Sequence, residues 1–222
     1  MGYRMAALVG IAGLVAAGAH AAATPVTPPP GASVEAPVFS WTLPANEQAV
    51  ALSIADKPDT TATGMFLAQN VVRAHSFTND ETTWSPSAPL YAGHYWWLVS
   101  SRDRTTAEPY SSAPSDFRVG LSFELDQLPV HRSLSHHWLR ISLRWKGNMR
   151  TVRFKLSILR RGKIIWARTG LRRNLVGSPG SVSFTWRRPQ GVKQGSVLTL
   201  REGMSVPGTS AGGGGFFTVR AP

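Results

Sequence analysis

The sequence predicts an all-β protein that contains two consecutive β-sandwich domains. Short runs of alternating apolar and polar residues recur after residue 37, and Gly, Pro, Asn and Ser separate them. Almost no stretch has the periodicity of an amphipathic helix. Alternation with period two, bounded by turn residues, is typical of antiparallel strands with one buried face. Each half of the chain after residue 37 has about the length of one β-sandwich, roughly 100 residues.

Residues 1–23 have the order of a secretory signal peptide. Arg4 is their single charge, residues 6–19 are an apolar run, and the small residues Ala19, Ala21 and Ala23 follow. The run is shorter than the roughly 20 apolar residues of a membrane span, which favours a cleaved export signal over an uncleaved anchor. We therefore expect a secreted or cell-envelope-associated protein with no transmembrane segment after cleavage. The chain has no cysteine, which excludes disulfides, zinc thiolate sites and a cysteine nucleophile.

The mature chain is expected to begin with a linker and to continue into two domains. Residues 24–36 are rich in proline and predict an extended linker. Strands of the first domain, residues 37–119, are expected near 38–43, 49–55, 65–72, 82–85, 92–101 and 115–119. Strands of the second domain, residues 120–222, are expected near 121–126, 137–146, 150–159, 163–168, 181–187, 196–201 and 216–220. Roughly one residue, Gly120, joins the domains, so we expect a restricted relative orientation.

The first domain resembles bacterial fibronectin type III modules. The residues that carry the resemblance are Gly93, Tyr95, Trp97 and Val99 in a G-x-Y-x-W-x-V strand after the Pro89-Leu90 turn, with Pro37, Phe39 and Trp41 before it and Ser115, Phe117 and Val119 after it. The resemblance covers residues 37–119 and implies a β-sandwich with an extracellular, noncatalytic role and no functional residues. The second domain looks generically immunoglobulin-like.

The charged residues divide unevenly between the two predicted domains. Residues 24–119 contain five basic and nine acidic residues, a net charge of −4, whereas residues 120–222 contain eighteen basic and three acidic residues, a net charge of +15. This asymmetry indicates an anionic partner for the second domain. Most of the cations are Arg, which binds phosphate and carboxylate groups in a bidentate manner. A merely solvated surface, or docking of the basic domain on its acidic neighbour, is the alternative.

The alternation in residues 137–146 and 150–159 predicts one buried and one exposed face for each of these strands. The inward residues are Leu139, Ile141, Leu143 and Trp145 in the first strand, and Val152, Phe154, Leu156 and Ile158 in the second. We expect the two strands to be neighbours, so that their outward residues form one polyanion-binding face. Its members are Trp138, Arg140, Arg144, Lys146, Arg153 and Lys155. An aromatic residue among cations is typical of surfaces that bind single-stranded nucleic acids or glycans.

A second candidate surface lies on the strand near residues 92–101. Trp96 and Leu98 point away from Tyr95, Trp97 and Val99, toward a face that such modules usually leave polar. Exposed apolar groups tend to mark binding sites, so the pair is a candidate protein- or glycan-contact patch. Alternatively, the Pro-rich segment or the second domain covers it.

No combination of residues predicts a catalytic site, a metal site or a cofactor. Residues 208–212 match G-x-S-x-G, but a nucleophile elbow requires a helix after the serine, and a glycine run follows instead, which indicates a flexible loop. His131, His136 and His137 lack a further ligand at useful spacing.

The sequence therefore favours a noncatalytic binding protein. In the leading hypothesis the second domain attaches electrostatically to an anionic polymer, which is a wall polymer, an acidic glycan, lipid headgroups or extracellular DNA. In the alternative, the chain is a structural or assembly module that recognises another protein through the apolar patch of Trp96 and Leu98.

Overall fold

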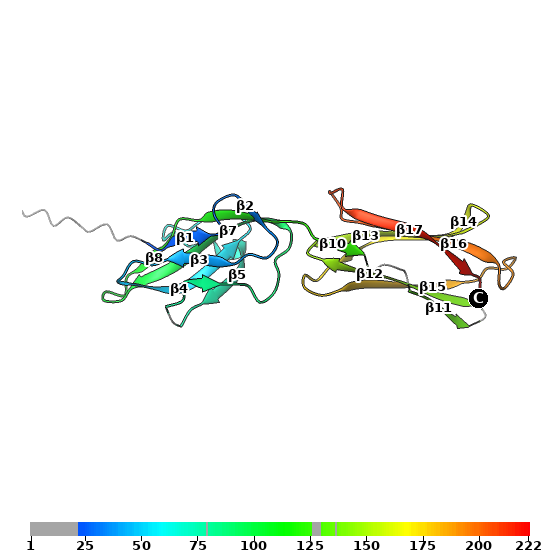
Figure 1. Ribbon diagram of the computed structural model, residues 1–222, viewed down its shortest axis with the longest axis horizontal. Coiled ribbons are helices and arrows are strands. Elements are labelled where there is room, and N and C mark those ends of the chain that lie inside the picture. The colour runs from blue at the N-terminus through cyan, green and yellow to red at the C-terminus, as the bar shows by residue number, and fades with distance from the viewer. Residues whose placement is uncertain (1–21, 79, 126–129, 136) are drawn as a thin grey trace, which may run out of the picture.

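The computed structural model describes residues 22–78, 80–125, 130–135 and 137–222. The predicted signal peptide lies outside the described residues, except for its last two. The described chain folds into strands and one short 3-10 helix, η1 (Ala68–Asn70). The strands form two sandwiches that lie end to end (Figure 1), which confirms the predicted all-β class.

The first sandwich has two sheets. One contains β1 (Thr24–Thr27), β3 (Phe39–Thr42) and β6 (Thr83–Trp84), in that spatial order. The other has the order β2-β9-β7-β4-β5, with β8 (Pro109–Ser111) paired to β7. Its members are β2 (Ala32–Val34), β9 (Ser115–Val119), β7 (Gly93–Asp103), β4 (Glu47–Ala55) and β5 (Val71–Ser76).

The second sandwich repeats this connectivity. In one sheet β12 (Trp138–Gly147) pairs with β10 (Phe123–Leu125) and β11 (Val130–Ser135) along one edge and with β15 (Gly180–Arg187) along the other. The facing sheet has the order β14-β13-β16-β17. Its members are β14 (Lys163–Arg173), β13 (Thr151–Arg160), β16 (Val197–Ser205) and β17 (Gly212–Arg220). The order β14-β13-β16-β17 matches β5-β4-β7-β9, so both halves are fibronectin type III- or immunoglobulin-like sandwiches.

The structure corrects the prediction of a linker over residues 24–36, because most of this segment belongs to the first sandwich. Thr24 pairs with Thr42, and β2 pairs in parallel with β9. Proline does not prevent this, because β1 is the edge strand of its sheet and the missing N–H of Pro25 can face away from β3.

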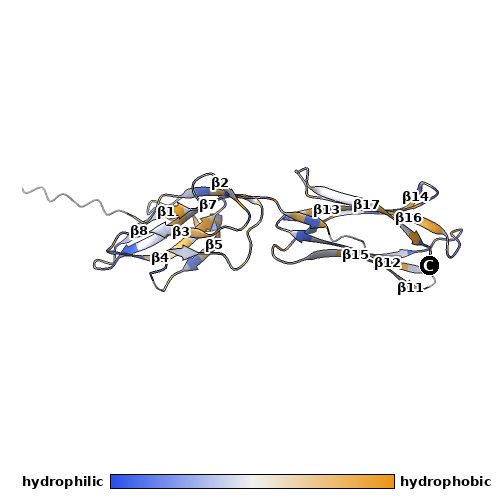
Figure 2. Cartoon of the chain, in the orientation of Figure 1, coloured by the Kyte–Doolittle hydropathy of each residue, from blue (hydrophilic) through white to orange (hydrophobic). Residues whose placement is uncertain are grey.

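The two hydrophobic cores follow the predicted alternation, and hydrophobic residues recur along the strands of both sandwiches (Figure 2). In the second sandwich, the inward residues of β12 and β13 pack with Trp186, Leu198 and Leu200, and each of them is 5% exposed or less. In the first, Phe39, Trp97 and Phe117 are fully buried and their rings contact edge to face. Each sheet therefore has an outward face whose residues are set by the strand register.

A cluster of hydrogen bonds joins the two sandwiches at Gly120. The Asn148 side chain donates to the Gly120 carbonyl (2.7 Å) and accepts from the Ser122 N–H (2.8 Å). Its backbone carbonyl accepts from the N–H of Ala92, in the first sandwich (2.9 Å). Tyr91 donates its hydroxyl to the Asn174 carbonyl (3.0 Å). Contacts from both sides of the joint thus hold residues 147–150 against the first sandwich.

Candidate functional site: two basic sheet faces

The outward side chains of β12 and β15 form a basic surface, which we call the β12 face. Its members are Trp138, Arg140, Arg144 and Lys146 on β12 and Arg187 on β15. All five are exposed, because the alternate residues of both strands enter the core. Arg187 is the cross-strand partner of Trp138, and its guanidinium carbon lies 5.6 Å from the indole centroid. The structure therefore brings together four of the six predicted binding residues and adds Arg187.

Hydroxyl groups fill the spaces between these cations. Arg144 is opposite Ser181, Arg140 is opposite Thr185, and Ser142 and Ser183 share a hydrogen bond of 2.7 Å. Residues two apart on a strand lie about 7 Å apart on one face. The β12 face is thus a row of cations with hydroxyl side chains between them.

Arg153 and Lys155 do not belong to this face, which corrects the prediction that β12 and β13 are neighbours. The chain crosses from one sheet to the other between the two strands. Alternation predicts which residues point outward, but it does not state which sheet a strand joins. The outward faces of two packed sheets point in opposite directions. The predicted single surface is therefore two surfaces on opposite sides of the sandwich.

We call the second surface, formed by the outward residues of β14, β13, β16 and β17, the β13 face. Its cations are Arg153, Lys155, Arg173, Arg201 and Arg220, and all are exposed. Arg201 lies opposite Phe216, with its guanidinium carbon 5.3 Å from the ring centroid. Sequence reasoning missed Arg173, Arg187, Arg201 and Arg220, although the same period-two alternation marks them as outward.

No cation of either face forms an ion pair within the described residues. The two ion pairs there, His94–Asp116 and Arg104–Asp80, both lie in the first sandwich. Glu202 is on the core side of β16, where burial raises the pKa of its carboxyl group. Two described acids lie near Lys146 at one end of the β12 face: Glu124, its cross-strand partner, and Glu35, which lines a cavity together with it. The positive charge of both faces is therefore largely uncompensated.

The structure corrects the prediction of a contact patch at Trp96 and Leu98, because Leu98 is only 1% exposed. Leu98 packs with Phe66 and Ala55 in a small separate core, and Trp96 lies half-buried against it. The segment between β4 and β5, which contains Phe66, covers the position, rather than the Pro-rich segment or the second domain. The sequence did not reveal this because loop residues have no period that predicts where they fold.

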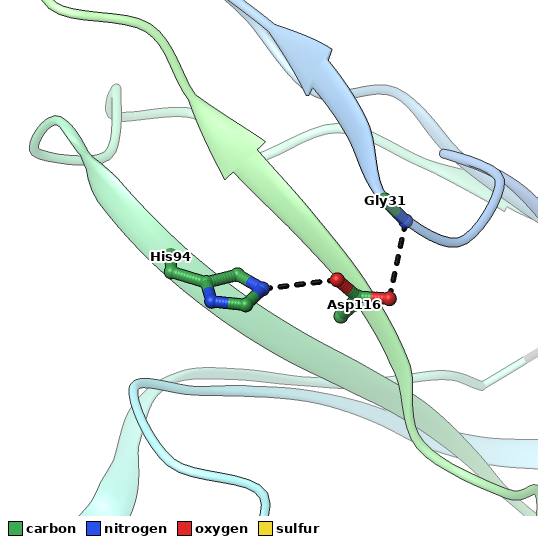
Figure 3. A network of polar contacts seen from close by, with 3 residues as sticks. All are labelled: Gly31, His94 and Asp116. Atoms are coloured by element: carbon green, nitrogen blue, oxygen red, sulfur yellow. Dashed lines mark hydrogen bonds and ion pairs between the residues drawn. The ribbon is translucent and has the colours of Figure 1, made fainter.

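Gly31, His94 and Asp116 form a polar network (Figure 3). Asp116 Oδ2 is 3.0 Å from His94 Nε2, and Asp116 Oδ1 accepts a hydrogen bond from the Gly31 N–H (3.1 Å). The contact with His94 is the main reason that the pKa of Asp116 is below its usual value. The His94 ring also lies against Trp96, at 4.2 Å between centroids. The network fastens β2 to β9, so we assign it a structural role.

The structure corrects the prediction of a flexible loop at the glycine run. Residues 212–215 form the first half of β17, where a Cβ at Gly214 would overlap the Glu202 backbone. Residues 207–211 are the turn before it. Within the described ranges no three metal-binding side chains lie together, and no helix there is long and apolar enough to span a membrane. The side chains of His131 and His136 lie outside the described residues.

Two cavities of the described chain lie at the joint between the sandwiches. The larger, of about 490 Å³, is lined mainly by small and apolar residues, among them Pro89, Val176 and Pro179, with Glu35 and Lys146 at its wall. The opposite charges of Glu35 and Lys146 give it no preference for anions.

No protein-family model matches the chain, and a search of curated proteins finds no match. Solved structures with a similar fold include a tetra-tandem repeat from the extending region of a large adhesion protein (14% identity, TM-score 0.47) and the FN1–FN3 domains of chicken CNTN1 (12% identity, TM-score 0.34). Each alignment covers 90% of this chain, which spans 48% of the first structure and 68% of the second. At these identities the likeness concerns the fold alone.

Proposed function

We propose that this protein is a noncatalytic, exported binding protein whose second sandwich attaches to an anionic polymer through the β12 face. The observation that carries the proposal is the row of exposed cations without an ion-pair partner in the described chain, Arg140, Arg144, Lys146 and Arg187. Like charges placed so close together repel one another, and an anionic ligand relieves that repulsion. Hydroxyl groups between them suit a hydrated polymer such as a wall polymer, an acidic glycan or extracellular DNA.

The predicted signal peptide supports an extracellular or envelope location for this activity. The first sandwich, with its net charge of −4, serves as a spacer in this proposal. The Trp96–Leu98 patch is not retained as a protein-binding alternative, because Leu98 is buried.

The test is the salt dependence of binding to heparin, a soluble polyanion. Neutralising four phosphate-like charges gives a log–log slope of about −3, so raising salt fourfold lowers affinity by roughly 50-fold to 150-fold. The variant Arg140→Ser/Arg144→Ser is expected to make the slope shallower by about 1.5, because two ionic contacts are lost.

The matched control is Lys57→Ser/Arg118→Ser, which removes the same charge from exposed positions of the first sandwich. It is expected to leave the slope unchanged. Equal slopes for the β12-face variant and the parent protein would show that this face does not hold the polymer.

A further inference from the structure

The β13 face differs from the β12 face in the large apolar side chains that it exposes among its cations. It exposes large apolar side chains, each between 56% and 67% exposed: Ile164, Leu171, Val197 and Phe216. Three of them are direct cross-strand partners of an arginine, in the pairs Leu171–Arg153, Phe216–Arg201 and Val197–Arg220. Cations and apolar groups thus alternate across the four strands of this face.

The β12 face lacks this pattern. Its uncharged positions are Ser142, Ser181, Ser183 and Thr185, and Trp138 is its one large apolar residue among the described side chains of β12 and β15. The two faces therefore have the same sign of charge, but large aliphatic side chains alternate with the cations on the β13 face and not along β12 and β15. A ligand that combines negative charge with an apolar part is expected to prefer the β13 face.

A partner for the β13 face must offer negative charge and apolar contact within one surface. Soluble polyanions offer charge alone. The bases of single-stranded nucleic acids stack on aromatic rings, whereas three of the four apolar residues here are aliphatic. The interface of an anionic bilayer presents phosphate groups directly above the acyl chains, which matches cations interleaved with aliphatic side chains.

We propose that the β13 face docks on an anionic phospholipid bilayer. The arginine and lysine side chains reach the headgroups, and Leu171, Ile164, Val197 and Phe216 enter the boundary with the acyl chains. The long stems of the cations allow this, because they lie along apolar surface while their charged ends stay in water. Among the described residues no acid faces outward on this sheet, since the Glu202 side chain is on the core side.

This inference does not depend on the proposed function, because it uses the opposite face. Each cation near an anionic membrane raises the partition coefficient about fivefold, which corresponds to about 1 kcal/mol. Arg153→Ser/Lys155→Ser is therefore expected to weaken binding to vesicles that contain phosphatidylglycerol by about 25-fold. Arg140→Ser/Arg144→Ser, the matched change on the β12 face, is expected to weaken it far less.

The experiment that places the face uses single cysteines, because the parent chain has none. An environment-sensitive nitrobenzoxadiazole label is attached at Leu171→Cys on the β13 face and, as a control, at Ser183→Cys on the β12 face. Both parent residues are exposed, so labelling leaves the cores intact. With phosphatidylcholine vesicles that contain phosphatidylglycerol, the label at 171 is expected to shift to the blue and brighten, and the label at 183 is not.

Three outcomes would overturn the proposal: a response at 183 instead of 171, an equal response to vesicles of phosphatidylcholine alone, or an equal response at 171 to heparin. The last would place a soluble polyanion on the β13 face. Phe216→Ser supplies a separate readout, because it keeps every charge. It is expected to lower vesicle binding about fivefold and to leave the heparin salt slope unchanged, and unchanged vesicle binding would contradict the apolar contact.

Discussion

Asn174 offers a sharp test of how the joint and the second core are held. The residue is 1% exposed, and its Oδ1 accepts the hydrogen bond of Trp145 Nε1 at 2.9 Å. Its Nδ2 donates to the carbonyls of Gly147 and Met149, both at 3.0 Å. Asn174→Ala removes all three bonds and leaves the indole N–H buried without an acceptor.

Each buried polar group that loses its partner costs about 1–3 kcal/mol. Because water can reach part of the vacated space, we expect the second sandwich to lose about 2–5 kcal/mol, a large share of a total of about 5–15 kcal/mol. Urea unfolding followed by tryptophan fluorescence measures the loss. Gln190→Ala, which removes an exposed amide, is the control and is expected to change stability by less than about 0.5 kcal/mol.

Asn174→Asp separates hydrogen bonding from packing. The aspartate keeps the shape of the side chain and the acceptor for Trp145, but it places an oxygen against the carbonyls of Gly147 and Met149. We expect it to destabilise at least as much as alanine at neutral pH. An Asn174→Asp protein as stable as the parent would refute the reasoning, because it would show that the two donated bonds contribute nothing.

Three further changes test other parts of the structure. Gly180→Ala places a Cβ where it overlaps atoms of the Trp145 ring, and the hydrogen bond from that ring to Asn174 restricts its movement. We therefore expect the free energy of unfolding, measured by thermal unfolding, to fall by about 1–3 kcal/mol; an unchanged Tm would contradict this contact. Burial raises the pKa of Glu202 above its ordinary value of 4.5, so its ionised form destabilises the fold; Glu202→Gln is expected to raise the Tm at pH 7, with a gain that shrinks as pH falls through the raised pKa and is gone once the pH is below 4.5. The pKa of Asp116 is lowered by His94, so this carboxylate stabilises the fold above its unfolded pKa; Asp116→Asn is expected to be destabilising near pH 6, with a deficit that disappears as pH falls below about 3.9.

Because alternation is a local property, the sequence predicted β12, β13 and β15 of the second sandwich closely, whereas it missed β11 and ended the strand that begins at Lys163 before Arg173. Leu139, Ile141 and Leu143 are buried and Arg140 and Arg144 are exposed, as their period of two requires. The sheet to which each strand belongs is not local. It depends on whether the connection after β12 turns back within the sheet or crosses to the facing one, and residues 147–150 have no sequence feature that decides this.

The two errors in the first sandwich have a similar cause. The proline content of residues 24–36 predicts a linker, yet β2 pairs with β9, more than 80 residues away in the sequence, and Asp116 accepts a hydrogen bond from the Gly31 N–H beside it. The alternation with Trp97 and Val99 predicts that Leu98 points to the outer face of the sheet. In the structure Phe66, from a loop, covers that position. Long-range contacts of this kind are invisible to composition and periodicity.

The separation of the cations into two opposite faces leads to a prediction that one merged face would not make. A protein with one basic surface would bind either heparin or an anionic vesicle, and the soluble polymer would displace it from the membrane. With the β12 face and the β13 face on opposite sides of the sandwich, one molecule is expected to hold both at once. Fluorescent heparin should then float with phosphatidylglycerol-containing vesicles only when the protein is present. Arg140→Ser/Arg144→Ser should keep the protein on the vesicles and lose the heparin, whereas Leu171→Ser/Phe216→Ser should release both. Displacement of the parent protein from the vesicles by heparin would show that the two ligands compete for one surface, and it would refute the assignment of separate roles to the two faces.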